Sequence, residues 1–261
     1  MTAPSSIAAR FQEHGVVHVP GFFAPQELAP LREVVLRFHT AWIAANEAFY
    51  RNRAVNSAYL TSPRYLSAED RLVLFQFLAQ ARVADVLAQV FRSPPAFMNT
   101  QLFFNPVDPT QPNYWHRDIQ YTGMSLEDQQ QALGKLNVVH LRVPLRPEPG
   151  LEVIPGTHQR WDTPSELSVR LEQPGHRNCD PLADALTVPL QPGDLLVFSA
   201  NMIHRGLYGM DRLAFDMLFC DPVPSLLAHV QQDCLPEDSV LEALSSPDIF
   251  LRARTTRGTA S

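Results

Sequence analysis

The chain carries a histidine and an aspartate separated by one residue, His116 and Asp118, in the stretch YWHRDIQ. In an extended strand the side chains at positions i and i+2 project to the same face, so both could contact one ion. An imidazole nitrogen together with a carboxylate oxygen suits a first-row metal such as Fe(II). Because so short a motif also occurs by chance on protein surfaces, the interpretation needs a third ligand from elsewhere in the chain.

The best candidate for the third ligand is His204, at the end of QPGDLLVFSANMIH. The PGD turn leads into an apolar strand, and we expect that strand to carry His204 near its far end. Two histidines and one carboxylate on one face form the facial triad of non-haem iron oxygenases, which leaves coordination positions open for a cosubstrate and oxygen. We therefore predict that His116, Asp118 and His204 are the metal ligands and the catalytic centre.

An arginine follows the third ligand at a short distance in the sequence. Arg212 opens the strand-like segment RLAFDMLF, and a fixed guanidinium beside a metal could bind a carboxylate with two parallel hydrogen bonds. The remote carboxylate of 2-oxoglutarate is the ligand that would fit, and Arg142 is the alternative anchor.

Two further polar side chains alternate with apolar residues in the segment VVHLRVPL. His140 and Arg142 share one face of the expected strand, opposite Val139, Leu141 and Val143. If that face lines the interior of a barrel, both side chains could contact cosubstrate or substrate. If it is the outer face, both are solvated, and periodicity does not choose between the two.

Composition excludes several classes of protein. With 261 residues, of which 45% are hydrophobic, the chain is long enough to bury a substantial core. A net charge of -6 argues against binding to nucleic acid or to an anionic membrane. The odd number of cysteines, without CxxC spacing, favours a reducing compartment. We also see no signal sequence or membrane-spanning segment, so we expect a cytoplasmic protein that acts on a small molecule.

The first third of the chain has helical patterning. A short strand is expected over 15–23 and a helix over 24–50, where apolar residues recur at helical spacing. A second helix is expected over 68–91, with Ser67 as its N-cap and Asp70 in its first turn. These helices are expected to pack on a sheet.

The sequence pattern changes after residue 96. Short strand-like segments separated by Pro, Gly or Asp turns continue to about residue 220, which is typical of an antiparallel sandwich or barrel. We therefore expect a single domain over 1–261, with a β core over about 97–220 and helical segments before and after it. A disordered tail is expected over about 253–261.

The same segments resemble the phytanoyl-CoA dioxygenase family of Fe(II)/2-oxoglutarate-dependent oxygenases, over most of the chain. GVVHVPGFFAPQELAPLREVV is similar to the opening strand and helix of that family, and NYWHRD to its proximal iron-ligand motif. GLEVIPGTHQ resembles the G-x-L-x-x-I-P-G-S-H signature. QPGDLLVFSANMIHRG resembles the strand bearing the distal histidine, and DRLAFDMLF the strand bearing the cosubstrate arginine.

The resemblance implies a mainly β fold with flanking helices, namely a double-stranded β-helix, or cupin-like jelly roll. It implies that Fe(II) is bound by the three ligands, that Arg212 and Gln101 contact 2-oxoglutarate, and that O2 is consumed as succinate is formed. Related halogenases lack the carboxylate ligand, so the presence of Asp118 favours hydroxylation or another hydrogen-abstraction outcome over halogenation. Two departures are visible: the turn RGLYGMD before Arg212 is short, and the loop before the G-x-L strand is trimmed to RPEPG.

The substrate is the least specified part of this interpretation. The loop 121–137 follows the H-x-D motif and could cover a substrate with Tyr121 and Met124. Arg117 should point away from the metal, and it could meet a substrate carboxylate only if the strand bends. The alternatives are a non-catalytic binding or sensing protein and a metal-dependent isomerase or lyase without 2-oxoglutarate. The pattern does not specify the oligomeric state, nor whether the outcome is hydroxylation, desaturation, epoxidation or ring formation.

Overall fold

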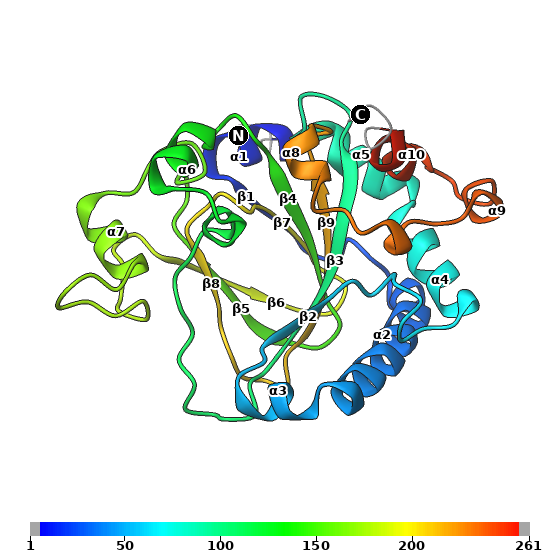
Figure 1. Cartoon of the computed structure of the whole chain (residues 1–261), viewed down its shortest axis with the longest axis horizontal. Helices are drawn as coiled ribbons and strands as arrows, with labels where there is room; N and C mark the ends of the chain where they lie inside the picture. The colour runs from blue at the N-terminus through cyan, green and yellow to red at the C-terminus, as the bar shows by residue number, and fades with distance from the viewer. Residues whose placement is uncertain (1–5, 256–261) are drawn as a thin grey trace.

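The computed structural model describes residues 6–255 (Figure 1). The strands are β1 Val16–Val19, β2 Asn56–Ala58, β3 Ala96–Phe104, β4 Val138–Pro144, β5 Glu148–Val153, β6 Leu186–Leu190, β7 Leu195–Ser199, β8 His204–Gly206 and β9 Leu213–Cys220. The α-helices are α1 Ile7–His14, α2 Pro25–Ala45, α3 Glu47–Asn52, α4 Ala68–Leu78, α5 Ala81–Val90, α6 Leu126–Ala132, α7 Pro164–Arg170, α8 Pro224–Leu227, α9 Asp238–Leu241 and α10 Asp248–Thr255. Two 3-10 helices, η1 Asp118–Thr122 and η2 Gln232–Cys234, complete the order.

The strands form two antiparallel sheets. The larger is six-stranded in the order β1-β7-β4-β9-β3-β2, and the smaller is three-stranded in the order β6-β5-β8. Apolar residues from the facing sides of both sheets, including Leu151, Val153, Leu196 and Phe198, form one small core between them. This arrangement confirms the expected mainly β fold with flanking helices of the cupin-like jelly-roll type.

Helices cover the outer face of the six-stranded sheet (Figure 1). The large core contains buried residues of α2, α4, α5 and α10 together with every second residue of the central strands, such as Val139, Leu141 and Val143 of β4. Successive side chains of a strand point to opposite faces, so the residues between these three must face the other sheet. The interior position of His140 and Arg142 follows from this alternation.

The expected helix over 68–91 is two helices. Ser67 caps α4 as expected, because its hydroxyl accepts a hydrogen bond from the backbone N–H of Asp70 at 3.2 Å. The helix ends at Leu78, however, and α5 starts at Ala81. The two axes are bent by 49° at the break, so the apolar face of each helix can reach the core separately. Within residues 6–255 no single helix is long and apolar enough to cross a membrane. Only this bent pair, taken as one segment, has the length and the apolar composition that a membrane span needs.

Two other expectations need correction. The segment predicted as one strand ending in His204 is two strands: β7 stops at Ser199, and His204 is the first residue of β8 in the smaller sheet. The tail expected over 253–261 falls mostly outside the described residues, but its first three residues form the end of α10 and are helical.

Gly150 allows β5 to approach β6 closely, and it lies in the irregularity of that ladder between Glu148 and Leu151. Its φ is +90°, and a Cβ atom there would fall on the carbonyl oxygen of Val188. We expect Gly150→Ala to lower the free energy of unfolding by about 2–4 kcal/mol, since both backbone strain and a backbone clash are introduced.

Gly175 provides a matched control, because it has the same φ of +90° but no atom within 4 Å of the position that a Cβ would take. Gly175→Ala should cost only about 1 kcal/mol of backbone strain. Urea denaturation of both variants measures the difference, and equal losses would contradict the packing argument.

Candidate metal centre and cavity

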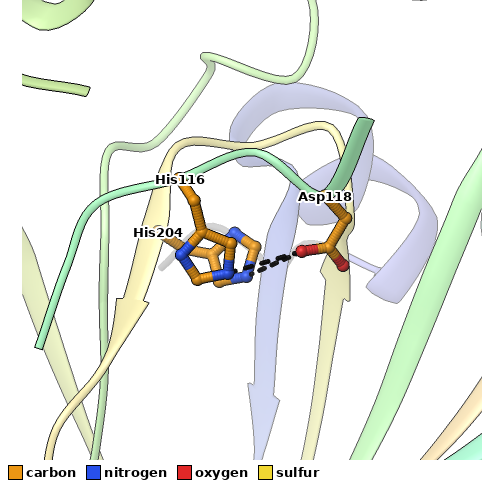
Figure 2. A group of neighbouring side chains, drawn as sticks. All are labelled: His116, Asp118 and His204. Carbon is orange, nitrogen blue, oxygen red and sulfur yellow. Dashed lines mark ion pairs between the residues drawn. The ribbon is translucent and has the colours of Figure 1, made fainter. Parts of the chain in front are cut away.

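His116 and His204 meet through their backbones. They form an isolated antiparallel bridge in which each N–H donates to the other residue's carbonyl at 3.0 Å. Asp118 does not continue this bridge as a strand residue, because it begins η1 and its N–H donates to the carbonyl of Ala200 at 2.9 Å. The expected single strand carrying both residues of the H-x-D motif is therefore absent, yet all three side chains still converge (Figure 2).

The three side chains place their donor atoms around one point. Nε2 of His116 lies 3.4 Å from Oδ1 of Asp118, and Nε2 of His204 lies 3.6 Å from the same oxygen. One nitrogen or oxygen atom from each residue lies within 4.8 Å of the other two, so a single ion could be held between them. Two imidazoles and one carboxylate are the donor set expected of a non-haem iron centre.

Hydrogen bonds to the backbone determine which ring nitrogen of His116 and of His204 faces this point. Nδ1 of His116 lies 3.1 Å from the carbonyl of Tyr114, and Nδ1 of His204 lies 2.9 Å from that of Met202. A carbonyl can only accept, so Nδ1 carries the proton and Nε2 is left free to bind a metal. Burial and the neighbouring His116 lower the pKa of His204 to about 3, so its ring is neutral.

Asp118 would be the anionic ligand, and about a third of its side chain is exposed (31%). Burial alone would raise the pKa of Asp118, but its interactions with the neighbouring His116 and His140 rings hold the pKa well below its ordinary value. Its second oxygen, Oδ2, accepts from Nε2 of His140 at 2.8 Å, and Nδ1 of the same ring donates to Asp216 at 3.0 Å. The two carboxylates raise the pKa of His140 to about 9 against the effect of burial.

The network continues from Asp216 to two arginines. Nη1 of Arg142 lies 3.4 Å from Asp216, while its Nε and Nη2 donate to Glu148 at 2.8 and 3.2 Å. Nε of Arg212 donates to the same Glu148 carboxylate at 3.1 Å. All four residues are buried. The arginines lower the pKa of Glu148, although burial opposes this, so the carboxylate is ionised.

Arg117 faces away from the metal ligands into the protein. Its side chain is completely buried: Nε donates to Asp162 at 2.8 Å, and Nη1 donates to the carbonyls of Thr157 and Asn201. Because it lies between His116 and Asp118 in the sequence, this anchor fixes the backbone that carries both ligands. This position gives no contact with the cavity, so the conditional role of Arg117 towards a substrate carboxylate finds no support.

The site opens into a cavity of about 640 Å³ between the two sheets. The other residues proposed from the sequence that line it are Gln101, Tyr121, Met124, His140, Arg142 and Arg212, together with the three ligands. Tyr121 is 61% exposed, at the rim. The volume lies within the range of about 300–1,000 Å³ that is typical of small-molecule sites.

Sequence reasoning missed two residues of this site, Glu148 and Asp216. Asp216 is a carboxylate in the middle of the apolar strand LAFDMLF, a pattern that signals a buried pair. Glu148 lies in RPEPG, which the sequence indicates only as a shortened loop. Tyr114 and Tyr208 also line the cavity, and neither is among the predicted site residues.

The sequence matches the family model described as phytanoyl-CoA dioxygenase over residues 11–207. That range covers well over half of the chain and includes the three candidate ligands. Among curated proteins, no sequence matches the chain.

Solved structures resemble the fold at low sequence identity. AviO1 from Streptomyces viridochromogenes Tue57 gives a TM-score of 0.57 at 20% identity, covering 85% of this chain and 98% of that protein. EctD from S. alaskensis with bound Fe gives 0.56 at 18% identity, covering 82% and 75%. The epimerase SnoN, in complex with Fe3+, alpha-ketoglutarate and nogalamycin RO, gives 0.54 at 18% identity, covering 83% and 82%.

Glu148 should be among the most costly charges to remove, because it compensates two buried guanidinium groups. We expect Glu148→Gln to lower the free energy of unfolding at pH 7 by about 3–5 kcal/mol, the cost typical of breaking a buried ion pair. The same strand supplies a control: Glu152 pairs with Arg205 where both side chains are partly exposed. Glu152→Gln should cost about 1 kcal/mol or less. Urea denaturation measures both, and equal costs would contradict the assigned importance of Glu148.

Proposed function

The chain belongs to the phytanoyl-CoA dioxygenase family, whose members use Fe(II), 2-oxoglutarate and O2, and we propose that it hydroxylates a small organic molecule. The observation that carries this proposal is the convergence of His116, Asp118 and His204 on one cavity, with the guanidinium of Arg212 also lining it. Hydroxylation would place one atom of O2 in the product and the other in succinate, with loss of CO2 from 2-oxoglutarate.

His116, Asp118 and His204 would hold the iron, which when bound supplies oxygen activation. The chain's own contribution is orientation. Both imidazoles present Nε2 because their Nδ1 protons are held by backbone carbonyls, and the aspartate is fixed from behind by His140. Such outer partners set the ring position and the basicity of a metal ligand.

Arg212 is the better anchor for the remote carboxylate of 2-oxoglutarate. Arg142 already uses Nε and both Nη groups on Glu148 and Asp216, whereas Arg212 uses Nε on Glu148. The Nη edge of Arg212 can therefore be offered to a ligand in the cavity. Gln101 lies opposite Asp216 in the β3–β9 ladder and lines the same end of the cavity, so it can add a neutral hydrogen bond to the cosubstrate.

The carboxylate ligand Asp118 supports hydroxylation over halogenation, because it occupies the coordination position that a halide would need. Two proteins of similar fold are described as an epimerase and a carbocyclase, and product analysis distinguishes those outcomes from hydroxylation. We propose a cytoplasmic location, which the free state of Cys179, Cys220 and Cys234 supports.

Asp118→Ala should abolish the iron site. We expect metal affinity to fall by more than about 100-fold. Mutation of a residue that only hydrogen-bonds to a metal ligand already lowers metal affinity by about 10–100-fold. Anaerobic titration of Fe(II) and 2-oxoglutarate, followed by the visible charge-transfer band, measures binding, and succinate release in air measures turnover. The matched control is Asp85→Ala, at an exposed position of α5. An unaltered band in Asp118→Ala would rule out the triad. A wild-type band without succinate from any candidate substrate would favour the non-catalytic alternative.

Gly206→Ala should weaken cosubstrate binding without affecting the metal. A Cβ at this position would lie 2.5 Å from Nη2 and 3.1 Å from Cζ of Arg212, so the guanidinium must move. We expect the dissociation constant for 2-oxoglutarate to rise by about tenfold or more, since a displaced bidentate pair loses charge-assisted hydrogen bonds. Co(II) affinity, measured by its absorption spectrum, should remain at the wild-type value. Unchanged 2-oxoglutarate affinity would argue against Arg212 as the anchor.

A further inference from the structure

Along the strands of the larger sheet, the cavity has one end with charged residues and one end that is apolar. In the larger sheet Arg142 of β4 lies opposite Asp216 of β9, and Asp216 lies opposite Gln101 of β3. With Glu148 and Arg212 beside them, these residues make a polar end. This is the end assigned above to 2-oxoglutarate.

The opposite end of the cavity is apolar. Two residues along β4 from His140, the strand presents Val138, whose carbonyl accepts from the N–H of Ala200 in the turn after β7. Leu218, the partner of His140 on β9, also faces this end. The apolar residues that line this part of the cavity are Met98, Ile119, Met124, Leu136, Val138, Leu218 and Leu226. We call this set the apolar wall.

Polar groups beside the apolar wall are uncharged. Asn99, Asn201, Thr122 and Ser225 line the cavity there. Their amide and hydroxyl groups can exchange hydrogen bonds with hydroxyl, carbonyl or ether oxygens of a ligand.

No lysine, aspartate or glutamate apart from Asp118 lines the cavity within residues 6–255, and the only lining arginines are Arg142 and Arg212. Both arginines lie at the polar end that is assigned to 2-oxoglutarate, and His229, which lines the apolar end, is exposed at the rim. A carboxylate or phosphate placed against the apolar wall below the rim would lose its water without gaining a counter-charge. Such desolvation costs several kcal/mol per ion.

From this division we infer that the organic substrate is a neutral, largely apolar small molecule that lies against the apolar wall. An acyl-CoA, a phosphate ester or a free carboxylic acid does not fit, because each carries a charge that this end of the cavity cannot compensate. The inference rests on the proposed function, since it assigns the polar end to 2-oxoglutarate.

The test uses two fluorescent probes with one ring skeleton. N-phenyl-1-naphthylamine is neutral, and 8-anilino-1-naphthalenesulfonate is the same molecule with one sulfonate. Both gain fluorescence in apolar surroundings. They are titrated into the wild-type protein with Fe(II) and saturating 2-oxoglutarate, without oxygen, so that the cosubstrate occupies the polar end. We expect the neutral probe to bind at least about tenfold more tightly, which corresponds to about 1.4 kcal/mol.

A positive charge added to the apolar wall should reduce the preference for the neutral probe over the sulfonate. Leu136→Arg, at a half-buried position of the wall, should tighten sulfonate binding by about tenfold while weakening the neutral probe. The matched control is Leu126→Arg on α6, 42% exposed and outside the cavity lining, which should leave both affinities unchanged. Met124→Arg at the rim is a second variant in case Leu136→Arg does not fold. Near-UV circular dichroism excludes partly unfolded samples, which bind the sulfonate non-specifically.

Three results would overturn the inference. These are equal or tighter wild-type binding of the sulfonate, binding of neither probe up to its solubility limit, and displacement of the neutral probe by 2-oxoglutarate. Failure of the proposed function is a separate outcome, because it shows as the absence of the charge-transfer band. The wild-type titration without metal or 2-oxoglutarate still compares the two probes in that case, and there too tighter binding of the sulfonate would contradict a neutral substrate.

Discussion

A continuous chain of opposite charges, buried except at its Asp118 end, runs from the candidate metal centre to the far end of the cavity. Its members, in order of contact, are Asp118, His140, Asp216, Arg142, Glu148 and Arg212. Removing each charge from water costs several kcal/mol, so each requires an opposite neighbour with good hydrogen-bond geometry. With His140 protonated there are three cations and three anions, and the chain is neutral. The position of the metal ligand is thereby coupled to that of the proposed cosubstrate anchor.

This charge chain and the apolar core require the same strand register. His140 and Arg142 are separated by Leu141, which packs against the outer helices. A slip of one residue in β4 would bury the two charged side chains under the helices and turn Leu141 into the cavity. The charges come from β4, β5 and β9, from the residue just before β9 and from the start of η1, so both sheets must be correctly placed before the chain of ion pairs can close. Gly150 contributes here, because it lets β5 approach β6 just after Glu148.

The placement of charge also explains how one cavity can serve two molecules. Arg142 and Arg212 line one end, which would suit a carboxylate of the proposed cosubstrate. Among the described residues that line the end near Val138 and Leu136 there is no lysine, arginine or glutamate, and His229 there is exposed at the rim. The three candidate ligands lie where these regions meet. A neutral substrate and an anionic cosubstrate could therefore reach the same metal from different sides, each excluded from the other's region by the cost of desolvation.

The amino-acid sequence by itself determined the motif residues, the mainly β class and the N-cap of α4, because each depends on spacing or local hydrogen bonding. His116, Asp118, His204 and Arg212 were proposed in this way and line one cavity, and the Ser67 cap is confirmed. Local pattern did not determine the break after Leu78, which depends on how two apolar faces reach one core.

Only the tertiary structure decided which face His140 and Arg142 take, where Arg117 points, and which arginine remains available to a ligand. The partners that decide these points are far apart along the chain: Asp216 lies 76 residues from His140, and Glu148 lies 64 residues from Arg212. Alternation shows that two residues share a face but not what that face meets. Charges in a dry interior are placed by partners from other strands, and those partners come together only when the sheets pack.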